Sequence, residues 1–499
     1  MNRKRKLFSP ITILMIVIVF AAIATWLVPA GKYDTLSFQD NTFKYNTDSG
    51  EQNLSFSQKT LDSLHILISL EKFSSGAIRK PVAVPGTFHL ITENSQGPID
   101  ILEAPLKGII DSIDIILFLF IIGGFMNVFH ETGAMVKGLT SLSYKMKGRE
   151  AWLIITLTFL FSFAGASYGM AEEALVFYPV MVPLFLAAGY DLLVPVAVIF
   201  GGTQLGTLSS FTNPFSTIIA SNAAGVNWTD GLGERVLMFV ISTGVTIWYL
   251  VHYAQKVKKD PSKSIVLRTD GNIVSPYENI KSAEAVEPLT GRTQLLLLLF
   301  LFTFLTMIAG VVFFDWWLTE MTALFLGVSI LIAVITRTGE SKFLSQFIKG
   351  AEGMLAVAFI VGVARGVTIV LNNGHISDSV LYYSARLVSG MPPSLFIIVL
   401  LVLFIIFTLF ISSSSGMAVL TMPIIGGLAV IVGVPGREIV NTYLFGMGIM
   451  GFMTPTGLIL PSLALANVSM KAWWKFIYPL LIILFILCAI FLIIGIHLK

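Results

Sequence analysis

Cysteine and charge are what this sequence has least of. Its 499 residues include one cysteine, Cys488. A single cysteine forms no internal disulfide, and without a Cys/His cluster it excludes a structural zinc site. Only 12% of the residues are charged, about half the fraction in soluble domains. The formal net charge of +3 is small for this length, and nothing indicates a nucleic-acid partner.

Long apolar segments make up most of the chain. Hydrophobic residues make up 55% of the chain, and the mean hydropathy is +0.83. A bilayer core of ~30 Å takes about 20 helical residues, and several segments are long enough. The first, Ile11 to Val28, is an unbroken apolar run after the basic residues 2–6. No small-residue cleavage site is clear there, so the sequence predicts an uncleaved first helix. The expected fold is all-α and polytopic, with the lipid bilayer as its surroundings.

Lys and Arg prefer short cytoplasmic loops, so the positions of these residues predict the topology. The N-terminus lies inside, about nine crossings follow, and the C-terminus lies outside a bacterial inner membrane. The polar linker is cytoplasmic because it is rich in Lys and Arg. The predicted units are a first helix 1–30, a small extracytoplasmic segment 31–104 with some strand, a first repeat 105–255, a linker 256–291, a connecting helical pair 292–345 and a second repeat 346–499.

Two parts of the chain, 165–230 and 412–474, look like copies of one unit. Ser167, Gly169, Met170 and Ala171 in the first copy match Ser414, Gly416, Met417 and Ala418 in the second at a constant spacing. Charge placement sends the corresponding helices across the membrane in opposite directions. The sequence therefore predicts an inverted repeat, which is typical of secondary transporters.

Each copy contains two interruptions of helical structure. Residues 151–189 and 394–432 have apolar arms that meet at Ser/Gly tips, which favours re-entrant hairpins; two complete crossings are the alternative for the first. Residues 192–225 and 439–468 are broken helices, interrupted at 209–214 and 453–457. Irregular backbone survives at membrane depth only inside protein or beside a water-filled cavity.

The tips and breaks are the candidate substrate site. Half-helix N-termini present N–H groups that bind anions, and Ser, Thr and Asn add neutral hydrogen bonds. A small carboxylate suits such a site. In the alternative interpretation, small residues simply let helices approach closely. The candidate substrate-binding residues are Ser167, Gly169, Thr212, Asn213, Ser413, Ser414, Thr454 and Thr456.

A cation or proton site is expected beside them. Carbonyls released at a helix break are hard ligands suited to Na⁺, and intramembrane carboxylates indicate function. Equally, if Gly169 caps the second arm, Glu172 stands at its third position, where it stabilises the helix start. Na⁺ or H⁺ is the expected coupling ion, with no other cofactor and no structural metal. The candidates are Glu172, Glu173, Thr207, Ser209 and Gly451.

Three further side chains have structural interpretations. Arg365 lies midway along an apolar helix, where pairing with Glu172 or Glu173 is favoured over contact with a substrate carboxylate. Trp473 and Trp474 lie next to basic residues, and we interpret them as anchors at the membrane–water interface.

The motifs resemble one transporter family over nearly the whole chain. They are Val28–Tyr33, Val84–Gly86, Ala104–Pro105 with Gly108–Ile109, Ile122–Phe125, Gly169–Glu173 through Phe177–Pro179, and Leu463–Val468. This pattern is similar to the YfcC-type branch of the C4-dicarboxylate anaerobic carrier (DcuC-like) family, in the ion transporter superfamily; its most specific part is Gly-Met-Ala-Glu-Glu. The resemblance implies secondary transport, a homodimer and an elevator movement, with substrate between hairpin tips and broken-helix Asn/Thr motifs. The second break departs from the pattern, because Thr454-Pro455-Thr456 has no adjacent Asn.

The leading hypothesis is a cation-coupled carrier of small carboxylate-bearing metabolites, either C4-dicarboxylates or amino acids. The alternative is a basic amino acid antiporter without net ion coupling. No His-Glu-Xaa-Xaa-His, Gly-Xaa-Ser-Xaa-Gly or paired intramembrane Asp motif indicates an enzyme. A channel is disfavoured because paired interrupted helices suit an alternating site better than an open pore.

Overall fold

The computed structural model of the chain describes residues 10–39, 41–48, 50–74, 78, 81–145, 149–277, 289–314, 316, 318–388, 390–411 and 413–497. Residues 2–6, on which the predicted cytoplasmic N-terminus depends, lie outside these ranges. So do Ser412 at the second tip and residues 278–288 of the predicted linker.

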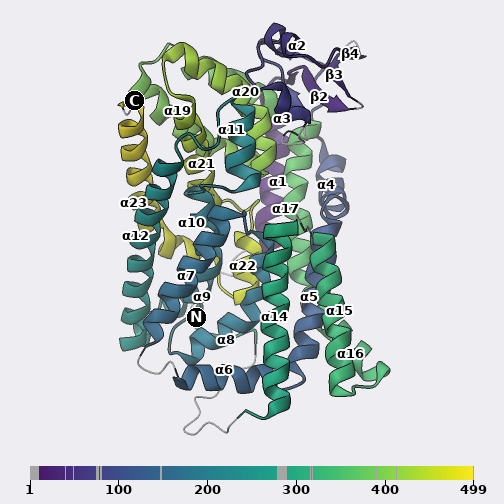
Figure 1. Cartoon of the computed structure of the whole chain (residues 1–499), viewed down its shortest axis with the longest axis vertical. Helices are drawn as coiled ribbons and strands as arrows, with labels where there is room; N and C mark the ends of the chain where they lie inside the picture. The colour runs from purple at the N-terminus through teal and green to yellow at the C-terminus, as the bar shows by residue number, and fades with distance from the viewer. Residues whose placement is uncertain are drawn as a thin grey trace, which may run out of the picture.

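Helices dominate the described part of the molecule (Figure 1). Seven of them are long and apolar enough to cross a bilayer: α1 (Pro10–Leu27), α5 (Ile113–His130), α7 (Glu150–Ser167), α12 (Leu232–Lys259), α15 (Leu318–Thr336), α17 (Leu355–Asn373) and α23 (Met470–His497). Their outer faces expose large apolar side chains such as Phe20, Trp248 and Ile494. A soluble protein rarely exposes so many large apolar side chains to water. These findings confirm a helical, multi-pass membrane protein.

The remaining helices range from short turns to the 24 residues of α14. They are α4 (Pro98–Asp111), α6 (Ala134–Lys145), η1 (Glu172–Phe177), α8 (Tyr178–Ala187), α9 (Leu193–Val196), η2 (Ala197–Gly201), α10 (Gly202–Leu208), η3 (Pro214–Ile218), α11 (Ile219–Ala223), η4 (Pro261–Lys263), α13 (Ile265–Asp270), α14 (Gly291–Phe314), α16 (Glu340–Gly353), α18 (Ser377–Val388), α19 (Pro393–Phe410), α20 (Ser414–Val432), α21 (Gly436–Gly451) and α22 (Ile459–Ala466).

The segment after α1 forms two small antiparallel sheets, so the fold is not purely α-helical. One sheet has the order β4 (Gly50–Leu54), β3 (Thr42–Thr47), β2 (Thr35–Gln39), β5 (Val82–Ala83); the other pairs β1 (Gly31–Lys32) with β6 (His89–Leu90). Leu36 and Phe43 point into a small core with Phe73 of α3 (Leu70–Ser74), while α2 (Gln58–Ser63) is capped by Ser57. β2 and β3 each bury one side chain, Leu36 and Phe43, and their other residues are partly or fully exposed, so the sheet covers this core with one face.

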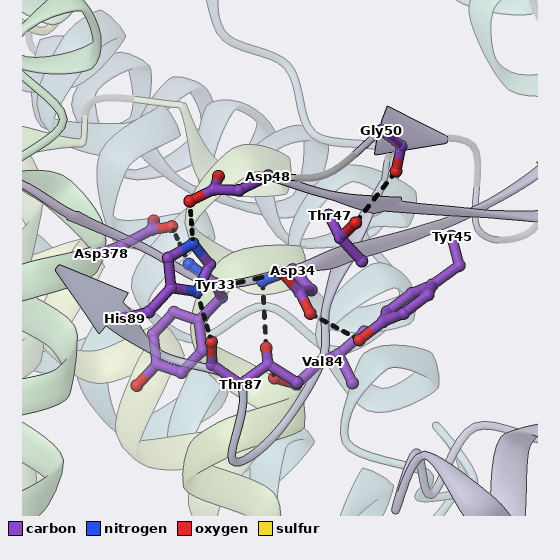
Figure 2. A network of polar contacts seen from close by, with 10 residues as sticks. All are labelled: Tyr33, Asp34, Tyr45, Thr47, Asp48, Gly50, Val84, Thr87, His89 and Asp378. Atoms are coloured by element: carbon purple, nitrogen blue, oxygen red, sulfur yellow. Dashed lines mark hydrogen bonds and ion pairs between the residues drawn. The ribbon is translucent and has the colours of Figure 1, made fainter. Parts of the chain in front are cut away.

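A polar network fastens these sheets to the second half of the chain (Figure 2). The backbone N–H of Tyr33 donates to Asp378 of α18 at 2.9 Å. His89 Nδ1 lies 2.8 Å from the carbonyl oxygen of Thr87, and its Nε2 lies 2.7 Å from Asp48. A carbonyl only accepts, so Nδ1 carries a proton, and the carboxylate favours a proton on Nε2. The hydrogen bond to Thr87, then the charge of Asp48, raise the pKa of His89.

The membrane helices form two series with the same order and similar lengths. The first four helices, α4 to α7, have 14, 18, 12 and 18 residues, and α16 to α19 have 14, 19, 12 and 18. The helices that end the two series, α12 and α23, each have 28.

Contacts between the two series are reciprocal. α4 packs against α17, and α5 packs against α16. A Cβ on Gly108 would collide with the carbonyl of Gly362, and a Cβ on Gly350 would collide with the carbonyl of Gly123. Glycine is therefore required at both crossings, because only it allows the backbones this close.

Corresponding helices of the two series lie at different heights in the molecule. In Figure 1, α8 lies toward the bottom of the view and its counterpart α20 toward the top, on the side of the sheets, whereas α11 lies above its counterpart α22, which is near the middle of the view. α22 packs against α8, and α20 packs against α11.

The start of the predicted linker is ordered against the membrane helices. Asp191, fully buried between α8 and α9, accepts hydrogen bonds from Tyr253 of α12 and Ser264 at 2.6 Å each. Asp270 accepts from the backbone and hydroxyl of Ser469 at 3.1 and 2.5 Å, just before α23. Residues 260–270 thus connect the first broken helix with the end of the second.

Candidate functional site

The segment predicted to be the first hairpin tip and the first helix break are hydrogen-bonded to one another. α7 ends at Ser167, and η1 begins at Glu172. Phe211 and Thr212 donate their backbone N–H groups to the carbonyl of Ala166, both at 3.2 Å. The Thr212 hydroxyl donates to the carbonyl of Ser167 at 2.9 Å. Two predicted site residues are thereby in direct contact.

Asn213 joins the same two segments through its amide. Its Nδ2 donates to the carbonyl of Gly165 at 3.0 Å. Its Oδ1 accepts the N–H groups of Phe215 at 2.9 Å and Ser216 at 3.3 Å, so it caps the helical run 214–223. The residue is only 4% exposed. Asn213 therefore fixes the position of the break against the tip.

Gly169 is the residue that makes this close approach possible. Its φ is +86°, and a Cβ there would lie 2.7 Å from Oδ1 of Asn213. Both the left-handed backbone and the missing side chain are needed. The sequence match between Gly169 and the second copy's Gly416 does not extend to conformation, because Gly416 lies within α20.

The second break is held by residues from elsewhere in the fold. α21 ends at Gly451 and α22 begins at Ile459, with the hydroxyls of Thr454 and Thr456 2.8 Å apart between them. Trp473 Nε1 donates to the carbonyl of Phe452 at 2.8 Å. Trp473 is completely buried, so the prediction that it anchors the membrane interface is wrong; Trp474 is 49% exposed.

The two broken helices also pack against each other. A Cβ on Gly448 would collide with Leu208 of α10, and a Cβ on Gly451 would collide with Gln204. The amide of Gln204 donates to the carbonyl of Gly448 at 3.4 Å. Gly451 therefore serves close packing in this structure. Gln204 was missed by the sequence analysis, since a lone Gln in an apolar helix has no distinctive pattern.

The second tip is tied to the second broken helix. Ser413 Oγ accepts the N–H of Gly416 at 3.2 Å at the start of α20. The carbonyl of Ser414 accepts a hydrogen bond from the Tyr443 hydroxyl of α21 at 2.7 Å. Tyr443 is another residue that the sequence pattern does not single out, because a lone Tyr in an apolar helix has no distinctive spacing.

The candidate cation residues have their own local hydrogen bonds. The hydroxyls of Thr207 and Ser209 donate to the carbonyls four residues earlier, at 3.2 and 2.9 Å. Glu173, 5% exposed, accepts the N–H of Ala171 at 2.9 Å. Glu172 is the first residue of η1 and not its third, since Ala171 is the capping residue. The helix-start role thus belongs to Glu173.

Arg365 is ion-paired, but with a different partner from the one expected. Its guanidinium contacts the carboxylate of Asp111, at the end of α4. The hypothesis that Glu172 or Glu173 is the partner is wrong for this conformation. The pair joins α17 to α4, the same helices that meet at Gly362 and Gly108.

Resident metal ligands are not gathered anywhere in the described ranges: no group of three or more His, Cys, Asp or Glu side chains there is arranged to hold an ion. The tips and breaks instead place hydroxyls, amides and backbone groups together. Such groups can form hydrogen bonds to a small polar molecule.

One known family matches almost the whole chain. The family model of the C4-dicarboxylate anaerobic carriers (DcuC) matches residues 7–497. The chain belongs to this family. The carrier is thus a membrane transporter of small metabolites and not an enzyme.

Two relatives match the carrier along its length. An uncharacterized protein of Haemophilus influenzae is 38% identical over 505 residues, covering 100% of this chain and 99% of that protein. YfcC of Escherichia coli, whose name proposes basic amino acid antiport, is 28% identical over 507 residues, covering 98% of this chain and 96% of that protein.

Two solved structures show weaker likeness to the carrier. MtrF of Neisseria gonorrhoeae, described within a class of antimetabolite efflux pumps, is 15% identical, with 99% and 96% of the two chains covered and a TM-score of 0.38. The YdaH transporter of Alcanivorax borkumensis is 13% identical, with 98% of each chain covered and a TM-score of 0.40. Neither score is high enough to support an argument about this carrier.

Proposed function

We propose that the carrier is a cation-coupled secondary transporter of small carboxylate-bearing metabolites, either C4-dicarboxylates or amino acids. The observation that carries the proposal is the direct bonding of the first tip to the first break, together with the contact between the two broken helices. Helix N-termini favour the carboxylate, and the Ser and Thr hydroxyls add neutral donors.

The proposed site has two halves with distinct roles. Ser167, Gly169, Thr212 and Asn213 form the first half, where Asn213 positions backbone N–H groups. The second half consists of Ser413, Ser414, Thr454 and Thr456. Glu172, Glu173, Thr207, Ser209 and Gly451 surround the coupling Na⁺ or H⁺. The side chains bonded locally in this conformation exchange partners when substrate or ion binds.

The architecture that we propose is an inverted repeat in an inner membrane, with nine crossings and two re-entrant hairpins. Its support is the matching order of α4–α12 and α16–α23, and the opposite vertical order in Figure 1 of α8 below α11 in the first series and α20 above α22 in the second. The N-terminus is inside and the C-terminus outside. In a homodimer, α4, α5, α16 and α17 form the fixed part, against which the hairpins and broken helices move as an elevator.

Exchange of basic amino acids is the second candidate. The name of the Escherichia coli relative favours it. Glu172 and Glu173, adjacent at the start of η1, offer negative charge to an amino group. A pair of carboxylates beside a dicarboxylate would instead be repulsive, unless a cation or proton neutralises them.

Uptake by purified carrier in proteoliposomes separates the two functions. Labelled succinate, aspartate and arginine are each offered with an inward Na⁺ gradient, with an inward H⁺ gradient, and with neither gradient but with internal amino acid. We expect succinate or aspartate uptake that depends on a cation gradient. Arginine uptake driven only by internal amino acid would replace this proposal with the exchanger, and no uptake of any of the three would refute both.

A further inference from the structure

A polar cavity lies away from the tips and breaks, between the ends of four helices. Its volume is about 350 Å³, and it is lined by the end of α5, the start of α14, the end of α15 and the start of α16. In Figure 1 these helices run together at the lower end of the view, opposite the sheets. The residues that carry the argument are Glu131, Arg292, Thr293, Thr336, Thr338 and Lys342.

The cavity is basic and rich in hydroxyl groups. In the described ranges neither Arg292 nor Lys342 has an ion-pair partner, although both line the same space. The hydroxyls of Thr336 and Thr338 are 2.7 Å apart. Glu131 is the one acidic lining residue, and it accepts a hydrogen bond from the Gln346 amide at 3.4 Å. The Thr336 hydroxyl also donates to the carbonyl of Ile332 at 2.8 Å, so Thr338 donates to Thr336. The walls therefore have a net positive charge, which favours an anion.

The surroundings indicate what kind of anion fits. α16 begins at Glu340 after Gly339, which has no side chain that could cap the helix. No capping side chain therefore accepts a hydrogen bond from the first backbone N–H groups of α16. Leu295, about one turn along α14 from Arg292, is 51% exposed on the apolar face of the helix. The cavity thus combines a cationic recess with an apolar surface that leads away from it. A phosphate head group on a hydrocarbon chain matches both parts.

We propose that this cavity binds the phosphate head group of an anionic phospholipid, with Arg292 and Lys342 on the phosphate and an acyl chain along α14 at Leu295. Basic pockets between transmembrane helices on the cytoplasmic side suit such head groups. The guanidinium of Arg292 bonds two phosphate oxygens, and Lys342 supplies a point charge. The assignment to the cytoplasmic leaflet rests on the topology proposed above.

The bound lipid has a structural consequence. α14 and α15 form the connecting pair between the two series, whereas α5 and α16 pack together across the series. A head group in the cavity bridges the connecting pair to both series at once. The lipid then stabilises the fixed part of the carrier without contacting the substrate site.

Lipid titration of the full-length carrier in detergent tests the assignment. Cardiolipin, phosphatidylcholine and inorganic phosphate are added separately, with thermal unfolding and native mass spectrometry as the readouts. We expect cardiolipin to raise the unfolding temperature and to remain bound in the gas phase. Arg292→Gln with Lys342→Gln should weaken its binding about thirtyfold. The control is Lys349→Gln, on α16 outside the cavity, which should bind as the wild type does.

Two results would overturn the proposal. One is unchanged cardiolipin binding by the double variant; the other is equal protection by inorganic phosphate alone, which would assign the cavity to a free anion. If the double variant does not fold, the single Lys342→Gln change is titrated, and it must still bind less lipid than Lys349→Gln. None of these readouts measures transport. A negative result for the lipid site would therefore leave the proposed transport function untouched, and a negative transport result would leave the lipid site untouched.

Discussion

Replacing Asn213 with alanine tests how the first tip and break are held together. The substitution removes the acceptor for Phe215 and Ser216 and the donor to Gly165. Loss of an N-cap costs about 1 kcal/mol. A buried carbonyl left without its partner costs roughly 1–3 kcal/mol more. The combined cost is about 2–4 kcal/mol, concentrated where the proposed substrate site lies.

Asn213→Ser separates the contribution of the N-cap from that of the hydrogen bond to Gly165. Serine is nearly as good an N-cap as asparagine, but it is too short to replace the bond to Gly165. We therefore expect the serine variant to recover about 1 kcal/mol of stability relative to alanine while transport stays low. Uptake of the substrate identified in proteoliposomes, measured beside thermal unfolding, should show KM raised more than about tenfold in both variants.

A matched control separates the site from general stability. Asn127 of α5 also donates its amide to a backbone carbonyl of another helix, that of Gln346, at 2.7 Å. Asn127→Ala should lose a similar amount of stability and keep a normal KM, because its bond lies between α5 and α16. Normal KM in Asn213→Ala, or an equal rise in both alanine variants, would refute the proposed role of Asn213.

Three other changes probe separate contacts. Gly451→Ala should reduce uptake by displacing the Gln204 side chain, and adding Gln204→Ala should restore at least half of it; no rescue would contradict the packing explanation. Glu173→Gln keeps an acceptor for the N–H of Ala171 but removes the charge, so we expect an unchanged unfolding temperature and altered dependence of uptake on Na⁺ or H⁺. The raised pKa of His89 means that its stabilisation of the sheets is complete below pH 6.5 and is lost as the pH rises through the folded-state pKa. Protection factors for hydrogen exchange in β3 and β4, which correct for the base-catalysed intrinsic rate, should therefore be lower at pH 8.5 than at pH 5.5, and His89→Gln or Asp48→Asn should remove most of that difference.

The sequence predicted the segments of the site better than their partners. Ser/Gly tips and Thr/Asn/Pro breaks interrupt apolar runs, and such interruptions have few causes in a membrane helix. Thr212 and Asn213 were identified in this way, and the structure joins them to the first tip. The predicted strands after the first helix were also found, because alternation and turn residues are local signals.

Contacts between distant segments could not be read from those local signals. The sequence predicted Glu172 or Glu173 as the partner of Arg365. The actual partner, Asp111, lies on a helix far away in the sequence, which no local pattern reveals. Trp473 was assigned to the interface by its basic neighbours, yet it is buried and bonded to Phe452. In both cases the helix packing, set by glycines such as Gly108, decides which partner is near.

The most direct test of a substrate site shared by both halves is protection of introduced cysteines by substrate. Native Cys488 is fully buried, which gives a low background. Thr212→Cys and Thr456→Cys are each treated with a methanethiosulfonate reagent, with and without the transported substrate, and Ile348→Cys on the exposed face of α16 is the control. The account predicts that substrate slows modification at positions 212 and 456 but not at 348. Protection at only one of the two positions, or at neither, would contradict it.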